Sequence, residues 1–139
     1  MSRTTYPLAH ETLADSGPSA GKVAFSNAVK IEGGPLLFVS GQLAYNEKRE
    51  LVGKGDIRAQ TRQVLENIKK ALTAAGADFS HVVKVTVFIK DMAHFREIHD
   101  VRLQYFKPGA LPASTMVSVS GFVHPDALIE IEAIAALRP

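Results

Sequence analysis

The sequence has no cysteine, no strong excess of either charge and no long apolar run, and each lack excludes a class of protein. Without cysteine there is no disulfide framework and no thiol chemistry, which fits a reducing compartment. A formal net charge of +2 is too small to indicate nucleic-acid binding, and the basic residues are scattered. No stretch approaches the roughly 20 apolar residues of a membrane span, and the N-terminus lacks a signal-peptide core. We therefore expect a soluble, cytoplasmic protein with no membrane or nucleic-acid partner.

The sequence contains enough apolar residues to form one hydrophobic core, since 46% of its 139 residues are hydrophobic. A chain of this length predicts a single domain over residues 1–139. Pro7, Gly17 and Pro18 lie among polar residues in the first part of the chain. Residues 1–20 are therefore predicted to be an irregular lead-in.

Periodicity of the apolar residues predicts the regular elements. Residues 23–31 and 36–39 predict strands joined by a tight hairpin-type turn at Gly33-Gly34. Residues 40–42 (Ser-Gly-Gln) interrupt the pattern and predict a bulge or a close backbone approach. Asp56 is a natural helix N-cap. A helix, a strand, a helix and two strands joined by a hairpin loop are then expected over residues 57–75, 82–90, 92–107, 114–120 and 128–137.

The usual catalytic motifs are absent from the sequence. His94 and His99 lie five apart on a predicted helix and project about 140° from each other, so they do not form a metal-binding pair. Residues 53–55 (Gly-Lys-Gly) lack the spacing and the preceding strand of a phosphate-binding loop. We interpret all five histidines as residues that bind no metal.

A set of polar residues nevertheless lies within apolar surroundings. Glu130 and Glu132 fall on one face of a predicted strand, where a carboxylate is costly unless it is paired or serves a site. The alternative is structural: one glutamate faces solvent at a subunit seam and the other forms an ion pair. The whole set comprises Ser40, Gln42, His99, Arg102, Ser114, Thr115, Glu130 and Glu132.

Arg102 is a charge on the apolar stripe of its predicted helix, one turn after His99. Two interpretations stay open. The arginine lays its stem on the core with its head in water, or its guanidinium acts as an anion clamp that holds a carboxylate through two parallel hydrogen bonds.

Several motifs in the same order resemble those of the RidA/YjgF family of small imine/enamine deaminases. They cover residues 25–29, 37–42, 66–67, 83–91 and 129–135. The resemblance implies an α+β chorismate-mutase-like fold in the order ββαβαββ, with a mixed sheet backed by two helices. It further implies a homotrimeric barrel with clefts between subunits, and a reaction that needs no metal or cofactor.

The resemblance also implies a site, and this chain departs from it. In the family an arginine after Pro-Ala binds the substrate carboxylate, and a glutamate at the position of Glu130 helps to place the water. Here Ser114 stands where that arginine is expected. Phe25 stands where a tyrosine is common, and His99 lies near a family asparagine. We therefore expect weak hydrolysis of ordinary 2-imino acids.

The predicted site is a cleft between the strand at Ser114 and Thr115, Glu130, and the helix face of His99 and Arg102, with a second subunit closing it. Phe25 and Ser40 are further candidates for binding the small-molecule ligand.

Three functions follow from this site. The first is a divergent, cofactor-free hydrolase of an enamine, imine or related carbonyl or amide compound. The second is a non-catalytic trimer that binds a metabolite or a partner enzyme. The third is RNA cleavage or translation inhibition, which the small, dispersed charge disfavours.

Overall fold

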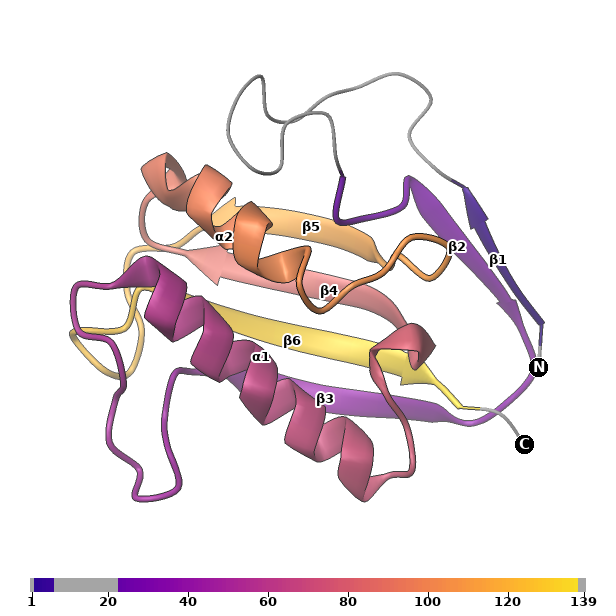
Figure 1. Cartoon of the computed structure of the whole chain (residues 1–139), viewed down its shortest axis with the longest axis horizontal. Helices are drawn as coiled ribbons and strands as arrows, with labels where there is room; N and C mark the ends of the chain where they lie inside the picture. The colour runs from indigo at the N-terminus through magenta and orange to yellow at the C-terminus, as the bar shows by residue number, and fades with distance from the viewer. Residues whose placement is uncertain (1, 7–22, 138–139) are drawn as a thin grey trace.

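The computed structural model describes residues 2–6 and 23–137, which form a mixed sheet packed against helices (Figure 1). The sheet has the strand order β3-β6-β4-β5, and β1 and β2 form a separate antiparallel pair. Neighbours in the larger sheet are antiparallel except β4 and β5, which are parallel. The elements are β1 (Ser2–Tyr6), β2 (Ala28–Glu32), β3 (Leu36–Gln42), α1 (Ile57–Ala74), η1 (Phe79–His81), β4 (Val82–Ile89), η2 (Met92–His94), α2 (Phe95–Arg102), β5 (Ala113–Ser118) and β6 (Ile129–Ala136). This arrangement confirms the predicted α+β fold class.

Helix α1 begins and ends where the sequence predicted. The Asp56 carboxylate accepts a hydrogen bond from the Ala59 amide at 3.1 Å and so satisfies one free donor of the first turn. After the helix, Gly76 adopts a φ of 72°, a conformation that glycine adopts without a Cβ penalty. The buried side of the helix carries Ile57, Gln60, Thr61, Val64, Leu65, Ile68 and Leu72.

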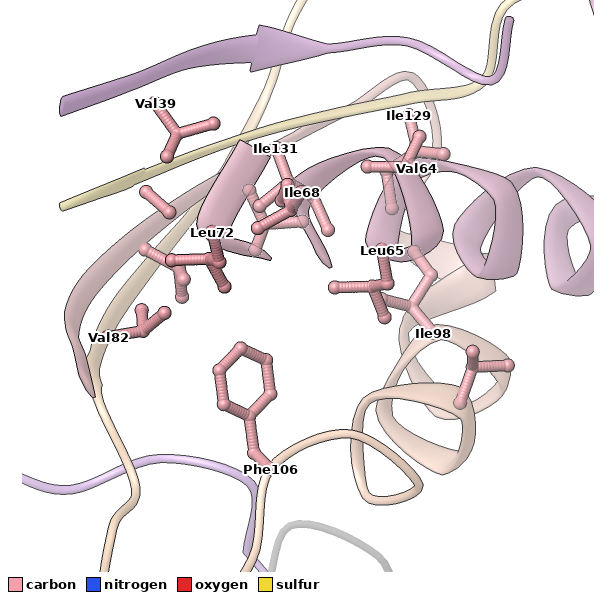
Figure 2. Packing of buried hydrophobic residues seen from close by; sticks show 14 of the residues in the cluster. Val39, Val64, Leu65, Ile68, Leu72, Val82, Ile98, Phe106, Ile129 and Ile131 are labelled. Carbon is pink, nitrogen blue, oxygen red and sulfur yellow. The ribbon is translucent and has the colours of Figure 1, made fainter. Parts of the chain in front are cut away.

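Both helices lie on the same face of the sheet, and the hydrophobic core fills the space between them and the strands (Figure 1). Figure 2 shows how side chains of α1 and α2 meet those of the strands. The labelled core residues are Val39, Val64, Leu65, Ile68, Leu72, Val82, Ile98, Phe106, Ile129 and Ile131, all buried.

Within the part of the chain that the structure describes, no helix covers the other face of the sheet, here called the open face. Leu36, Phe38 and Val117 lie on it with 47%, 68% and 37% of their surface exposed. Large apolar side chains at such exposure indicate a surface that associates with something else. Strand alternation and register place Leu36, Phe38, Lys84, Thr86, Phe88, Ala113, Thr115, Val117, Glu130, Glu132 and Ile134 on this face.

Two predictions about the N-terminal third were wrong. Residues 2–6, expected to be irregular, form β1, because this Thr- and Tyr-containing stretch alternates half-buried and exposed side chains against β2. The rest of the predicted lead-in, residues 7–20, lies outside the described residues. The chain bends at Gly33 and Gly34, with φ of 75° and 88°, but this is not a hairpin turn, because β2 pairs with β1 and not with β3.

Three further differences lie in the second half. β5 and β6 are not a hairpin, because β4 lies between them and pairs with both. α2 is shorter than expected: it begins at Phe95, after η2, whose N-cap is Asp91, and the chain after Arg102 continues in turns. Strict alternation along residues 82–90 would place Val83 on the buried face with Val85, but β4 has a register shift between Val82 and Lys84, and Val82 is the buried residue.

Candidate functional site

The Glu130 carboxylate lies on the open face of β6, directly over the backbone of β3. At that point β3 carries the predicted irregularity, a register shift between Val39 and Gln42. A Cβ added to Gly41 would overlap the Glu130 carboxylate, so this close approach depends on glycine. The bulge therefore makes the space in which the carboxylate sits.

Burial and charge both act on the ionisation of Glu130. Removal from water raises the pKa of this carboxyl above its usual value, and the negative charge of Glu132 raises it further. Phe88 pairs with Glu130 across the sheet and contributes to its apolar surroundings. A carboxyl with a raised pKa keeps its proton to a higher pH than a free glutamate does, which suits a group that takes up and returns a proton during a reaction. Ser40, one residue before the bulge glycine, is exposed.

A second polar group lies on the helix side of the sheet. The Arg102 guanidinium is 3% exposed and donates a hydrogen bond to the Ser114 hydroxyl at 2.9 Å. Its Nε has no partner among the described residues. Burial lowers the pKa of Arg102 to about 10, so the side chain stays charged at neutral pH. The interpretation that Arg102 extends its head into water is wrong, whereas the anion clamp stays a prediction.

His99 lies one helical turn before Arg102 on α2, and Phe25 precedes Ser26, which forms a bridge with Ala113 beside Ser114. His99 is buried on α2 and stacks on Phe95, with ring centroids 5.9 Å apart and planes 11° apart. Phe25 is half-buried. The bridge between Ser26 and Ala113 is an isolated parallel one at the start of β5. The Ser26 amide donates to the Pro112 carbonyl at 2.8 Å and its hydroxyl to the Leu111 carbonyl at 2.7 Å. These bonds hold the segment around Phe25 against β5.

Thr115 points away from Arg102, onto the open face. There its hydroxyl accepts a hydrogen bond of 2.6 Å from the Lys84 ammonium. Sequence reasoning missed Lys84 as a partner of this site. The alternating pattern of residues 82–90 placed Lys84 on the polar face of its strand, but only the parallel pairing of β4 with β5 brings it to Thr115.

One chain does not bring all the predicted site residues together. Ser114 pairs with Val85, on the face that packs against the helices, whereas Glu130 pairs with Phe88 on the open face. β4 also lies between the two strands. The expectation that Ser114 and Glu130 occupy neighbouring strands was wrong, because the parallel crossover places β5 beyond β4. The chain therefore presents two separate groups: Arg102 with Ser114 and His99, and Glu130 over Gly41.

Among residues 2–6 and 23–137, no cluster of histidine, aspartate and glutamate side chains is arranged to hold a metal ion. Within the same described ranges, neither the length nor the apolarity of any helix is sufficient for it to cross a membrane.

Comparison with known proteins places this geometry in a family. Residues 17–137 match the family model described as Endoribonuclease L-PSP. A RutC family protein of Pyrococcus horikoshii is 48% identical over 111 residues, which cover 80% of this chain and 85% of the relative. The 3-aminoacrylate deaminase RutC of Acinetobacter baylyi is 43% identical over 100 residues, covering 72% of this chain and 78% of that protein.

Solved structures agree with these sequence relatives. A protein of the conserved Rid family from Yersinia pestis has a TM-score of 0.82 at 32% identity, and the match covers 99% of this chain and all of that one. A YjgF-family member from Mycobacterium tuberculosis has a TM-score of 0.65 at 33% identity, covering 98% of this chain and 100% of the other. Sequence, fold and the arrangement of β3 against β6 lead to one conclusion: this chain belongs to the RidA/YjgF family.

Proposed function

We propose that this protein is a cofactor-free hydrolase of a small enamine, imine or related carbonyl or amide metabolite, acting in clefts between the subunits of a homotrimer. The observation that carries the proposal is the Glu130 carboxyl, held over Gly41 on an uncovered face with its pKa raised by desolvation. Partial removal of this carboxyl from water costs free energy, so its presence there indicates a catalytic role rather than a stabilising one.

Assembly into a trimer is supported by the open face. Phe38, Leu36 and Val117 are exposed in the single chain. Closed association of identical subunits would bury this apolar surface without leaving a new exposed edge. The same association would cover the Glu130 carboxyl with a second subunit, because Glu130 lies on the open face. Light scattering at micromolar concentration tests it, and a stable monomer would contradict it.

In the proposed reaction, water adds across a C=N bond and the resulting carbinolamine expels ammonia to leave a carbonyl product. The ionised Glu130 takes a proton from the attacking water and returns it to the nitrogen, so the carboxylate is regenerated. Arg102, held by Ser114, supplies a fixed positive charge for the anionic end of the substrate. An enamine substrate first tautomerises to the imine, gaining a proton at carbon and losing one from nitrogen, and then follows the same course.

The substitution at position 114 defines the expected substrate range. A serine hydroxyl cannot replace a bidentate arginine–carboxylate contact, whose loss costs about one to several orders of magnitude in rate. We therefore expect slow clearance of 2-aminoacrylate-type imines. The relative named 3-aminoacrylate deaminase supports adding 3-aminoacrylate to the substrates tested.

The decisive experiment is a screen of 2-imino acids generated in situ from amino acids, together with 3-aminoacrylate, followed by release of ammonia. Glu130→Gln should abolish any turnover. The matched control is Glu132→Gln, an exposed carboxylate on the same face of the same strand, which should retain turnover. Ser114→Arg should speed clearance of 2-imino acids. Equal activity of wild type and Glu130→Gln on every substrate would overturn the hydrolase proposal.

A non-catalytic binding role is the second candidate, and one observation favours it. The buried Arg102 already has a partner in Ser114, an arrangement that suits retention of an anion as well as its conversion. Retained binding of a 2-keto acid with no turnover in the wild type would establish this role. RNA cleavage is disfavoured by the net charge of +2.

A further inference from the structure

A hollow of about 790 Å³ lies outside both groups described above, and residues of the loop after β3, of the loop before β6 and of α1 line it. Its volume is within the range of small-molecule sites. None of the residues assigned to the proposed hydrolase site lines it. Its lining consists of Gln42, Tyr45, Asn46, Glu47, Arg49, Asn67, Lys70, Val123 and His124.

Hydrogen bonds fix the walls of this hollow. The Asn67 amide on α1 donates to the Leu43 carbonyl at 3.0 Å and to the Tyr45 carbonyl at 2.9 Å. The Asn46 side-chain oxygen accepts from the backbone amides of Lys48 and Glu50 at 2.9 and 3.0 Å. The loop that carries the lining residues is therefore organised before any ligand arrives, which lowers the entropic cost of binding.

Arg49 supplies an unpaired positive charge at the hollow. Its φ of 61° lies in the left-handed region, where a non-glycine residue is uncommon and costs energy. The backbone bond from its amide to the Asn46 carbonyl, 3.0 Å long, helps to hold that conformation. Its guanidinium has no hydrogen bond or ion pair to any described residue. By contrast, Lys70 lies 3.4 Å from the Glu47 carboxylate and is neutralised.

The opposite wall offers an aromatic surface and further donors. Tyr45 and His124 meet edge to face, with ring centroids 6.1 Å apart and planes at 70°. The Asp126 amide donates to His124 Nδ1 at 3.0 Å, so the neutral imidazole carries its proton on Nε2. The Tyr45 hydroxyl has no hydrogen bond to the described residues, and Val123 adds an apolar side chain that is 89% exposed.

We propose that this hollow binds a small organic carboxylate with a planar apolar body, such as an aromatic acid. Arg49 holds the carboxylate, the Nε2–H of His124 and the Tyr45 hydroxyl donate to it, and the body lies against the Tyr45 ring and Val123. The ligand needs both a negative charge and a flat apolar face, because the hollow offers one unpaired cation, Arg49, and one aromatic wall, formed by Tyr45 and His124. This second site does not depend on the proposed hydrolase activity.

Titration of the full-length protein with three probes tests the proposal, with backbone amide resonances as the readout. Benzoate carries both features, acetate lacks the ring and benzyl alcohol lacks the charge. We expect benzoate to shift the resonances of Tyr45, Val123 and His124, and to bind more tightly than either partial probe. Shifts confined to other residues, or equal affinities for acetate and benzoate, would overturn the proposal.

Two variants locate the charge contact. Arg49→Asn removes the guanidinium and keeps a residue that tolerates positive φ, so the loop conformation is preserved. It should weaken benzoate binding about tenfold or more, as expected for loss of a charge-assisted hydrogen bond. The matched control Lys69→Gln removes an exposed cation that does not line the hollow and should leave affinity unchanged. An equal loss in both variants would mean that benzoate senses only net charge, and would refute the site.

Glu130→Gln separates this site from the hydrolase proposal. Benzoate should bind this variant as it binds the wild type, whatever its effect on turnover. A loss of the benzoate-induced shifts at Tyr45 and His124 in this variant would show that the two sites are one and would overturn the proposal.

Discussion

The two faces of β6 differ in burial and in the kind of side chain that they carry. Ile129, Ile131 and Ala133 are at most 2% exposed against the helices. Glu130 and Glu132, which alternate with them, lie on a face that no helix covers within the described ranges. One strand thus stabilises the fold with one set of side chains and presents ionisable groups with the other. Alternate residues of one strand can therefore have different roles: those on one face stabilise the core, and those on the other face are available for chemistry.

The strongest test of this separation is truncation on the covered face. Ile131→Ala removes a fully buried side chain from the core and should lower the free energy of unfolding by about 2–5 kcal/mol. The matched change Ile134→Ala lies on the open face of the same strand and should cost less. Denaturant unfolding, with both variants compared at one protein concentration, measures the difference. Equal losses would erase the distinction between the two faces.

Truncation of the most exposed aromatic side chain on the open face should affect association rather than folding. Phe38→Ala removes a side chain that is 68% exposed in the single chain. If that face joins subunits, loss of a central aromatic should weaken association by about 2 kcal/mol or more. Analytical ultracentrifugation across a dilution series measures this effect, and circular dichroism should show unchanged secondary structure. An unaltered association constant would remove Phe38 from the proposed interface.

The Arg102–Ser114 hydrogen bond lies on the helix-covered side of the sheet, and its removal tests how much a buried polar pair contributes to stability there. Ser114→Ala removes the hydrogen-bond partner of a buried guanidinium and should lower stability by about 1–3 kcal/mol. Ser118→Ala, an exposed serine on the same strand, should change stability by less than about 0.5 kcal/mol. Thermal unfolding of the two variants provides the comparison, and indistinguishable midpoints would mean that the bond contributes nothing.

The smallest expected effect is the contribution of Glu130 to the pH dependence of the free energy of unfolding. Because burial raises the pKa of Glu130 in the folded state, the folded protein binds more protons than the unfolded chain over the interval between the two values. The stability that this group contributes is therefore complete below the unfolded pKa, near the ordinary glutamate value of 4.5, and is lost as the pH rises through the folded pKa. Glu130→Gln should be the more stable protein at neutral pH, and its unfolding should lack this pH dependence. Parallel stability profiles of variant and wild type would contradict the predicted shift.

Local patterns in the sequence predicted most of the elements and part of the site. The alternation of residues 128–134 placed Glu130 and Glu132 on one face, and the Ser-Gly-Gln stretch predicted the bulge at Gly41. The apolar stripe that carries Arg102 predicted a charge close to the core, and the motif order predicted the family. All of these features depend on residues that are near one another in the sequence.

Strand order could not be predicted in the same way. Nothing local distinguishes a β5 that pairs with β6 from one that pairs with β4, because either partner leaves the same alternation in residues 113–118. In the folded protein the chain crosses over through α2, and β5 then pairs with β4 in parallel on the side away from β6. The separation of Ser114 from Glu130, and the contact of Lys84 with Thr115, both follow from that long-range choice.

The position of β6 has a consequence for how the protein is made. β6 is the last strand of the described chain, yet it lies between β3 and β4 and pairs with both, with Leu36 opposite Ala136. During synthesis, β3 and β4 leave the ribosome without the strand that joins them, and the backbone N–H and C=O groups on the edges that pair with β6 stay unpaired until that strand emerges. Such non-local pairing slows folding and exposes the nascent chain to aggregation. Ribosome-bound chains that stop before residue 129 should therefore depend on chaperones, whereas release of β6 should close the sheet in a single cooperative step.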